Sequence, residues 1–194
     1  MNYATNMQLT ISDMLVGSRS YARPMLVAIG ALLLVLSAKV QIPLWPVPMT
    51  MQTYVVLVLA MAYGTRLGAM TVGVYLLAGA LGLPVFAGTP EKGVGLPYML
   101  GPTGGYLIGF MLATLLLGRL AARGWDRRMW TSLLAMGSAH VLILACGAAW
   151  LAGLIGWERA IAAGVTPFIL ATVLKTVLAG VTLPIAWKWV RRLR

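Results

Sequence analysis

Charged residues, and acids above all, are scarce in this sequence. Asp, Glu, Lys and Arg together make up 10% of its 194 residues, whereas they make up about 25% of an average soluble domain. Hydrophobic residues account for 60%, and the mean hydropathy is +0.88. This composition excludes an ordinary soluble domain and indicates an integral membrane protein with short loops. Little chain remains for a nucleotide-binding domain, so ATP-driven work would have to come from a partner.

Reactive and metal-binding side chains are equally scarce. The chain has one cysteine, one histidine and four scattered acids, which excludes an internal disulfide and disfavours a metal site. An intramembrane enzyme would need a nucleophile with its base, or an acidic dyad. Ser138 and His140 are only two positions apart and point to different faces of a helix. We therefore expect no enzyme, no cofactor and no metal.

Six apolar runs predict the fold class, an all-α integral membrane protein with six transmembrane helices. The runs cover residues 24–40, 50–63, 67–83, 104–122, 131–153 and 167–189. Residues 1–23 are then a cytoplasmic N-terminal segment, 24–190 the transmembrane domain and 191–194 a basic cytoplasmic tail. We expect the first run to be a span rather than a cleaved signal peptide, because its leader is long and no clear cleavage site follows.

The cations are distributed unequally between the two sides that six spans define. Eleven of the 15 Lys and Arg residues fall on the side of both termini: Arg19, Arg23, Arg66, Arg119, Arg123, Arg127, Arg128, Lys188, Arg191, Arg192 and Arg194. Lys39, Lys92 and Arg159 fall on the other side, and Lys175 lies within the sixth run. This asymmetry predicts that both termini are cytoplasmic. In a membrane protein this asymmetry accounts for the net charge of +11, so the charge is no sign of nucleic-acid binding. Basic residues of the tail can also contact anionic lipid.

The two long loops on the outer side are apolar and rich in Gly and Pro. They read QIPLWPVPM over 41–49 and PVFAGTPEKGVGLPYMLGPT over 84–103. Because loops in water are usually polar, we expect both to fold back into the mouth of the protein and to cap an outward-facing cavity. Tyr75 and Phe86 flank the second loop and are expected to be pocket walls.

Lys175 is the most informative ionisable residue within the apolar runs. It lies eight residues after Pro167, about 12 Å into the sixth helix at 1.5 Å per residue. An intramembrane Lys without a neighbouring acid is a candidate functional residue. His140 is expected to make a structural hydrogen bond between helices, and Lys39 to snorkel at the outer end of the first helix. Thr50 and Gln52 need polar partners, from the protein or from a ligand.

Three motifs resemble those of the BioY family, the biotin-specific S components of energy-coupling-factor transporters. The stretch VPMTMQT (47–53) is similar to the family's VPxTxQT signature. YLLAGALGLPVFAG (75–88) is similar to YLxxGxxGLPVFAG, and GPTGGYL (101–107) repeats the family's GPTGGYL element. The motifs occur in the family's order and spacing, and the resemblance covers roughly residues 24–190.

The resemblance implies a six-helix substrate-binding subunit that captures extracellular biotin at the bacterial cytoplasmic (inner) membrane. It also implies a transmembrane coupling protein and cytoplasmic ATPases as partners, although some family members are reported to work without them. Solitary biotin uptake is therefore the alternative function. From the motifs and the deep polar residues, the candidate substrate-binding residues are Trp45, Thr50, Gln52, Tyr75, Phe86, Gly88, Gly104, Tyr106, Thr172 and Lys175.

The sequence departs from the family pattern at the start of the sixth run. The family carries PFxPGDxxK there, whereas this chain has PFILATVLK over 167–175, with Thr172 in place of the acid. A hydroxyl supplies no charge to balance Lys175. An ammonium without a counter-charge is costly in an apolar bundle, so we predict that Lys175 binds the biotin carboxylate. The alternative is that it donates to the ureido oxygen, with Thr172 or Gln52 serving the ureido nitrogens.

Overall fold

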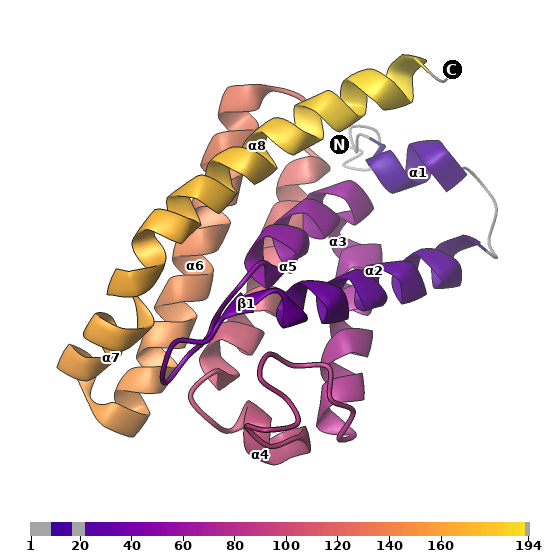
Figure 1. Ribbon diagram of the computed structural model, residues 1–194. Coiled ribbons are helices and arrows are strands. Elements are labelled where there is room, and N and C mark those ends of the chain that lie inside the picture. The colour runs from indigo at the N-terminus through magenta and orange to yellow at the C-terminus, as the bar shows by residue number, and fades with distance from the viewer. Residues whose placement is uncertain (1–8, 17–21, 193–194) are drawn as a thin grey trace, which may run out of the picture.

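The computed structural model describes residues 9–16 and 22–192, which form a bundle of helices with one pair of short strands (Figure 1). The helices are α1 (Ile11–Val16), α2 (Ala22–Lys39), α3 (Gln52–Ala80), α4 (Gly95–Met99), α5 (Gly104–Ala121), α6 (Met129–Ile155), α7 (Trp157–Gly164), the 3₁₀ helix η2 (Thr166–Phe168) and α8 (Ile169–Arg192). The strands β1 (Gln41–Ile42) and β2 (Met49–Thr50) pair antiparallel, with Gln41 opposite Thr50.

The long apolar helices confirm a multi-pass helical membrane protein. Among the described residues, five helical stretches are long and apolar enough to cross a membrane: Ala22–Lys39, Gln52–Ala80, Gly104–Ala121, Met129–Ile155 and Trp157–Val190. Four of the predicted runs, 24–40, 104–122, 131–153 and 167–189, lie largely in α2, α5, α6 and α8.

The other two predicted runs, 50–63 and 67–83, both lie largely in α3, which is bent between them. Gly64 has φ 74° and ψ −177°, a combination open almost only to glycine. The corner packs against α5 at Gly118, where an added Cβ would collide with the backbone of Thr65. The helix therefore changes direction at Gly64, where the absence of a side chain permits the backbone break. Gly118 also lacks a side chain, which permits the close approach of α5 to Thr65.

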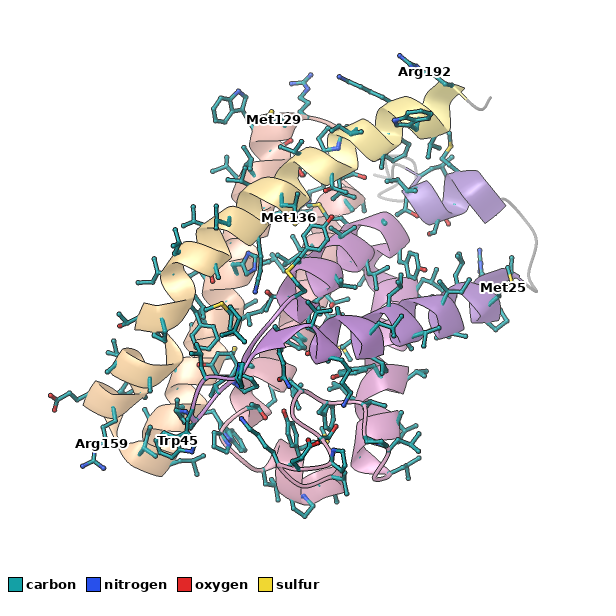
Figure 2. All side chains as sticks on the ribbon, viewed as in Figure 1. Met25, Trp45, Met129, Met136, Arg159 and Arg192 are labelled. Atoms are coloured by element: carbon teal, nitrogen blue, oxygen red, sulfur yellow. The ribbon has the colours of Figure 1, made fainter. Side chains whose placement is uncertain are left out.

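The two ends of the molecule carry different elements. Figure 1 shows α1 and the end of α8 at one end, and α4 and α7 at the opposite end. In Figure 2, Met129 and Arg192 lie at the first end, whereas Trp45 and Arg159 lie at the second. The segments 41–49 and 84–103 therefore share the end that carries α7, as the side assignment from the sequence predicts.

Two segments hold more structure than the sequence analysis predicts. The all-α expectation is wrong for 41–50, where β1 and β2 pair. The stretch after the fifth run forms the short helix α7, which has one polar and one apolar face, before η2 leads into α8. Both deviations lie in connections, where short-range backbone pairing satisfies N–H and C=O groups that would otherwise be exposed in apolar surroundings.

The predicted segments 1–23 and 191–194 lie partly outside the described residues, and Arg19 and Arg194 lie wholly outside them. Within the first segment, α1 packs against α3 and α8. The Ser12 hydroxyl donates to the Tyr63 carbonyl at 3.5 Å, next to the bend in α3. On the same end, the Trp187 indole N–H donates to Asp126 at 2.5 Å and joins α8 to the connection between α5 and α6.

The bend at Gly64 generates a stability prediction. Gly64→Ala forces a side chain into a strained conformation and brings its Cβ to 2.9 Å from the Thr10 methyl carbon. We expect a loss of about 1–3 kcal/mol of unfolding free energy, measured by thermal unfolding in detergent. Gly153→Ala is the matched control, because it lies within α6 and an added Cβ meets nothing within 4 Å. Equal unfolding curves for the two variants would contradict the role given to Gly64.

Candidate functional site

A cavity opens between the helices and the two apolar loops of the end that carries α7. The cavity and its open mouth together contain about 630 Å³ of empty space, a figure that includes space open to solvent. The helices α3, α5, α6 and α8 supply most of its walls, and the loops supply the rest. The lining residues are Val47, Pro48, Thr50, Gln52, Thr53, Tyr75, Phe86, Ala87, Tyr98, Thr103, Tyr106, Leu107, Phe110, His140, Ile143, Leu144, Phe168, Thr172 and Lys175.

Three aromatic rings build the wall beneath the second loop. Phe86 is fully buried; it stacks on Tyr98 with ring centroids 4.9 Å apart and meets the edge of Tyr75 at 5.5 Å. The Phe86 ring occupies the space that a side chain at Gly79 would need. Gly79 is thus required for Phe86 of the loop to reach into the bundle.

The phenol groups of this wall hold the backbone of the loop. Tyr75 donates to the Val85 carbonyl at 3.4 Å, and Tyr98 donates to the Ala87 carbonyl at 2.7 Å. Burial raises the pKa of the Tyr98 phenol, so Tyr98 remains a neutral donor throughout the physiological pH range. Two tyrosines from different elements therefore fix the carbonyls on either side of Phe86.

Lys39 is the third tie on the same loop. Its ammonium donates to the Phe86 carbonyl at 3.0 Å, to the Thr89 carbonyl at 2.9 Å and to the Thr89 hydroxyl at 3.1 Å. Lys39 is exposed at the end of α2, as expected for a snorkelling lysine, and the loop folds back there and offers three oxygens close by. Hydrogen bonds from a charged donor are stronger than neutral ones, so Lys39 anchors the loop over the cavity.

Lys175 gives the cavity lining a polar side. Its ammonium donates to the Thr50 carbonyl and to the Thr53 hydroxyl, the latter at 3.4 Å. Gln52 is 4% exposed and donates to the Leu34 carbonyl at 3.3 Å. Within the described ranges, the hydrogen-bond partners of Lys175 are both neutral oxygens, so these contacts leave its positive charge uncompensated.

His140 lies on α6 and reaches the same cavity. It is 2% exposed, and its Nδ1 is 2.7 Å from the Thr176 hydroxyl on α8. The Thr176 hydroxyl also donates to the Thr172 carbonyl at 2.7 Å. The predicted hydrogen bond between helices is thereby confirmed. It joins α6 to the segment of α8 that carries both Thr172 and Lys175.

The remaining wall is aromatic and fixes the end of α7. Tyr106 donates to the Gly164 carbonyl at 2.6 Å, and its ring lies 6.3 Å from that of Phe168. Tyr106 also fills the space that a side chain at Gly147 would need. The cavity is thus closed by aromatic rings around one polar side, an arrangement suited to a flat, mostly apolar molecule with a few polar groups.

The structure brings most of the ten candidate residues from the sequence into this cavity. The seven that line it are Thr50, Gln52, Tyr75, Phe86, Tyr106, Thr172 and Lys175. Trp45 does not line the cavity, since its side chain is 83% exposed on the loop between the strands. Gly88 faces the Lys92 stem, and Gly104 packs under Trp150. These two glycines shape the backbone around the cavity rather than line it.

Several lining residues escape the sequence analysis. Tyr98 reads in sequence as one of a belt of interfacial aromatics, yet it stacks on Phe86 inside. Phe110, Ile143 and Phe168 are apolar residues of apolar segments, and nothing in their spacing separates cavity wall from bundle core. Thr53 follows Gln52 in the VPMTMQT motif, and this position in the sequence is a signal for a lining residue. No three His, Cys, Asp or Glu residues gather as a metal site within the described chain.

The ties on the loop predict that Lys39 controls its order. Lys39→Met removes the donor to three oxygens, so the segment 86–93 should loosen. We expect hydrogen exchange of the Lys92 and Gly93 amides to accelerate about tenfold, measured by mass spectrometry. Lys188→Met makes the same charge change at the other end of the molecule and serves as the control. If both variants exchange like the native protein in this segment, Lys39 does not anchor the loop.

Comparison with known proteins points to one family. A sequence model described as the BioY family matches residues 7–192. The chain is 37% identical over 154 residues to a "Probable biotin transporter BioY" of Pyrococcus horikoshii, covering 79% of this chain and 89% of that protein. It is 39% identical over 150 residues to a "Biotin transporter BioY" of Thermotoga maritima, covering 76% and 85%.

A solved structure shares the fold. It is described as the S-component for biotin from an ECF-type ABC transporter, and it superposes with a TM-score of 0.74. The match covers 89% of this chain and 94% of that chain, at 21% sequence identity. At this level of identity the comparison establishes the fold alone.

Proposed function

The chain belongs to the BioY family, and from this membership we propose that it binds extracellular biotin in the cavity and mediates its uptake across the cytoplasmic membrane. The relatives carry the name of transporters, not of enzymes. The observation that carries the proposal is the cavity itself, which lies between the family's three motifs and is lined by residues of each. Because the relatives are transporters, an intramembrane enzyme is no longer an alternative function.

The chemistry of biotin fits the two kinds of wall. Its fused rings and pentanoate chain are largely apolar, and they match the faces of Tyr75, Phe86 and Tyr106. Its ureido group and carboxylate need hydrogen-bond partners, which Gln52, Thr172 and Lys175 offer on the polar side. The loops 41–49 and 84–103, which contribute Val47, Pro48, Phe86 and Ala87 to the lining, are proposed to form the lid of the cavity.

Lys175 is proposed to bind the biotin carboxylate. Its partners Thr50 and Thr53 are neutral, so a ligand anion is the natural counter-charge in an apolar bundle. Thr172 lies three residues before it on α8 and also lines the cavity. The alternative, donation from Lys175 to the ureido oxygen, leaves the ammonium without a negative partner and is tested by the same experiment.

The Lys175 proposal predicts a difference between two ligands. Lys175→Ala leaves the ligand carboxylate unpaired, so biotin binding should weaken by about 2–5 kcal/mol, measured by equilibrium binding to purified protein. Biotin methyl ester carries no charge and should lose little. Lys188→Ala, on the same helix but on a basic groove with Arg127 and Arg192, is the charge-matched control and should bind both ligands normally.

Two results would count against this assignment. Equal affinity of the native protein for biotin and its methyl ester would place the carboxylate away from Lys175. If Lys175→Ala weakens the binding of biotin and of its methyl ester equally, the ammonium donates to the ureido oxygen instead.

We further propose six spans with both termini in the cytoplasm. The two halves of α3 run on either side of the break at Gly64, and counting them as separate spans gives six. Arg123, Arg127 and Arg128 lie in the connection between α5 and α6, at the end opposite Arg159. The excess of cations at that end supports a cytoplasmic position for it.

The orientation predicts where a reporter fused to the C-terminus will function. A fluorescent protein that matures only in the cytoplasm should be bright, and alkaline phosphatase, which needs the oxidising exterior, should be inactive. A fusion to the Gly93 position of the outer loop should show the reverse. The opposite pattern at both positions would invert the proposed topology.

The proposed partners are a transmembrane coupling protein and a pair of cytoplasmic ATPases. One face of α2 supports a partner in the membrane, since Met25, Ile29, Leu32, Leu33 and Leu36 are exposed along it. Lipid alone can also cover this face, which keeps solitary uptake as the second candidate. Copurification from native membranes, with and without added biotin, separates the two.

A further inference from the structure

His140 lines the cavity, and one buried polar atom of its ring has no hydrogen-bond partner among the described residues. The side chain is 2% exposed and lies in the cavity wall. Its Nε2 is buried and has no hydrogen-bond partner among the described residues. Buried polar atoms are almost always paired, so this atom has a partner to gain when a ligand enters.

The hydrogen bonds around His140 determine which ring nitrogen carries the proton. We assign the one proton of the Thr176 hydroxyl to the Thr172 carbonyl, which can only accept. The hydroxyl oxygen must then accept from the nitrogen at its other side, the His140 Nδ1 at 2.7 Å. Nδ1 therefore carries a proton, and in the neutral ring Nε2 is left with a lone pair.

The surroundings favour the neutral ring. Lys175 lies close enough to interact electrostatically with His140, and a second positive charge beside it in an apolar site would be repelled. The lone pair of Nε2 would also repel a carboxylate. The ligand group that fits this atom is therefore a hydrogen-bond donor, not an anion.

We propose that His140 is a specificity-determining residue whose Nε2 accepts a hydrogen bond from an N–H group of the ligand. The inference rests on the proposed function, and in biotin the matching donors are the two N–H groups of the ureido ring. Thr176 acts as a positioning residue, because its hydroxyl fixes the tautomer and the orientation of the imidazole. The cavity thus distinguishes cyclic ureas from molecules of the same shape that lack the donor.

The test pairs a change in the protein with a change in the ligand. Binding of biotin and of its two isomers monomethylated on a ureido nitrogen is measured by equilibrium binding to the purified protein. Methylation at one of the two nitrogens should weaken binding to the native protein about tenfold more than binding to His140→Phe. The second isomer should show no such dependence on His140, which separates the lost hydrogen bond from general crowding.

Variants of Thr176 keep the test valid if His140→Phe does not fold. Thr176→Val removes the hydroxyl that positions the ring and should reduce the same discrimination, whereas Thr176→Ser keeps the hydroxyl and should retain it. Ser138→Ala is a control on the same helix, since Ser138 donates to the Ala135 carbonyl and lies outside the cavity lining. This variant should discriminate like the native protein.

The outcomes separate this inference from the proposed function. If the native protein binds biotin but methylation costs the same factor in native protein and His140→Phe, His140 does not read the ureido group. If His140→Phe instead abolishes the difference between biotin and its methyl ester, the ring acts on the carboxylate and the inference is overturned. If the folded native protein binds no biotin, the proposed function itself fails.

Discussion

The structure depends on placing one ammonium, that of Lys175, inside an apolar bundle. The charge is tolerated there because the chain turns back after β2 and offers the Thr50 carbonyl and the Thr53 hydroxyl. Those contacts join α8 to the start of α3, which are more than a hundred residues apart in sequence. Neutral oxygens reduce the cost of burial without cancelling the charge, so a positive charge remains at the cavity, and the proposed partner for it is the biotin carboxylate.

A second constraint is the need to bury the loop that follows α3, which carries few charges. Phe86 enters the bundle where Gly79 leaves room, and Tyr75, Tyr98 and Lys39 satisfy the loop carbonyls around it. Each tie comes from a different element, so the loop can be ordered only when these elements are assembled. A segment held by hydrogen bonds to its backbone, and not by a helix or strand of its own, can open without unfolding the bundle.

The sequence predicts the membrane-spanning segments well because hydropathy acts over whole segments, and errors at single residues matter little. It also predicts that Tyr75, Phe86 and Lys175 lie at the cavity. Their positions, in a loop motif or deep in a span, are unusual for such residues. It fails where function depends on contacts across the chain. The sequence predicts Lys39 as a snorkelling cation, but not the loop oxygens to which it donates. His140 reads as structural, and its free Nε2 becomes visible only once Thr176 is known to occupy Nδ1.

We propose that this chain contains a complete biotin site without any partner subunit. The test is equilibrium dialysis of labelled biotin against the purified protein, in the absence of a coupling protein or ATPase. We predict saturable binding of one biotin per chain, competed by unlabelled biotin. Protein that is folded by its thermal unfolding transition yet shows no saturable binding would contradict the account.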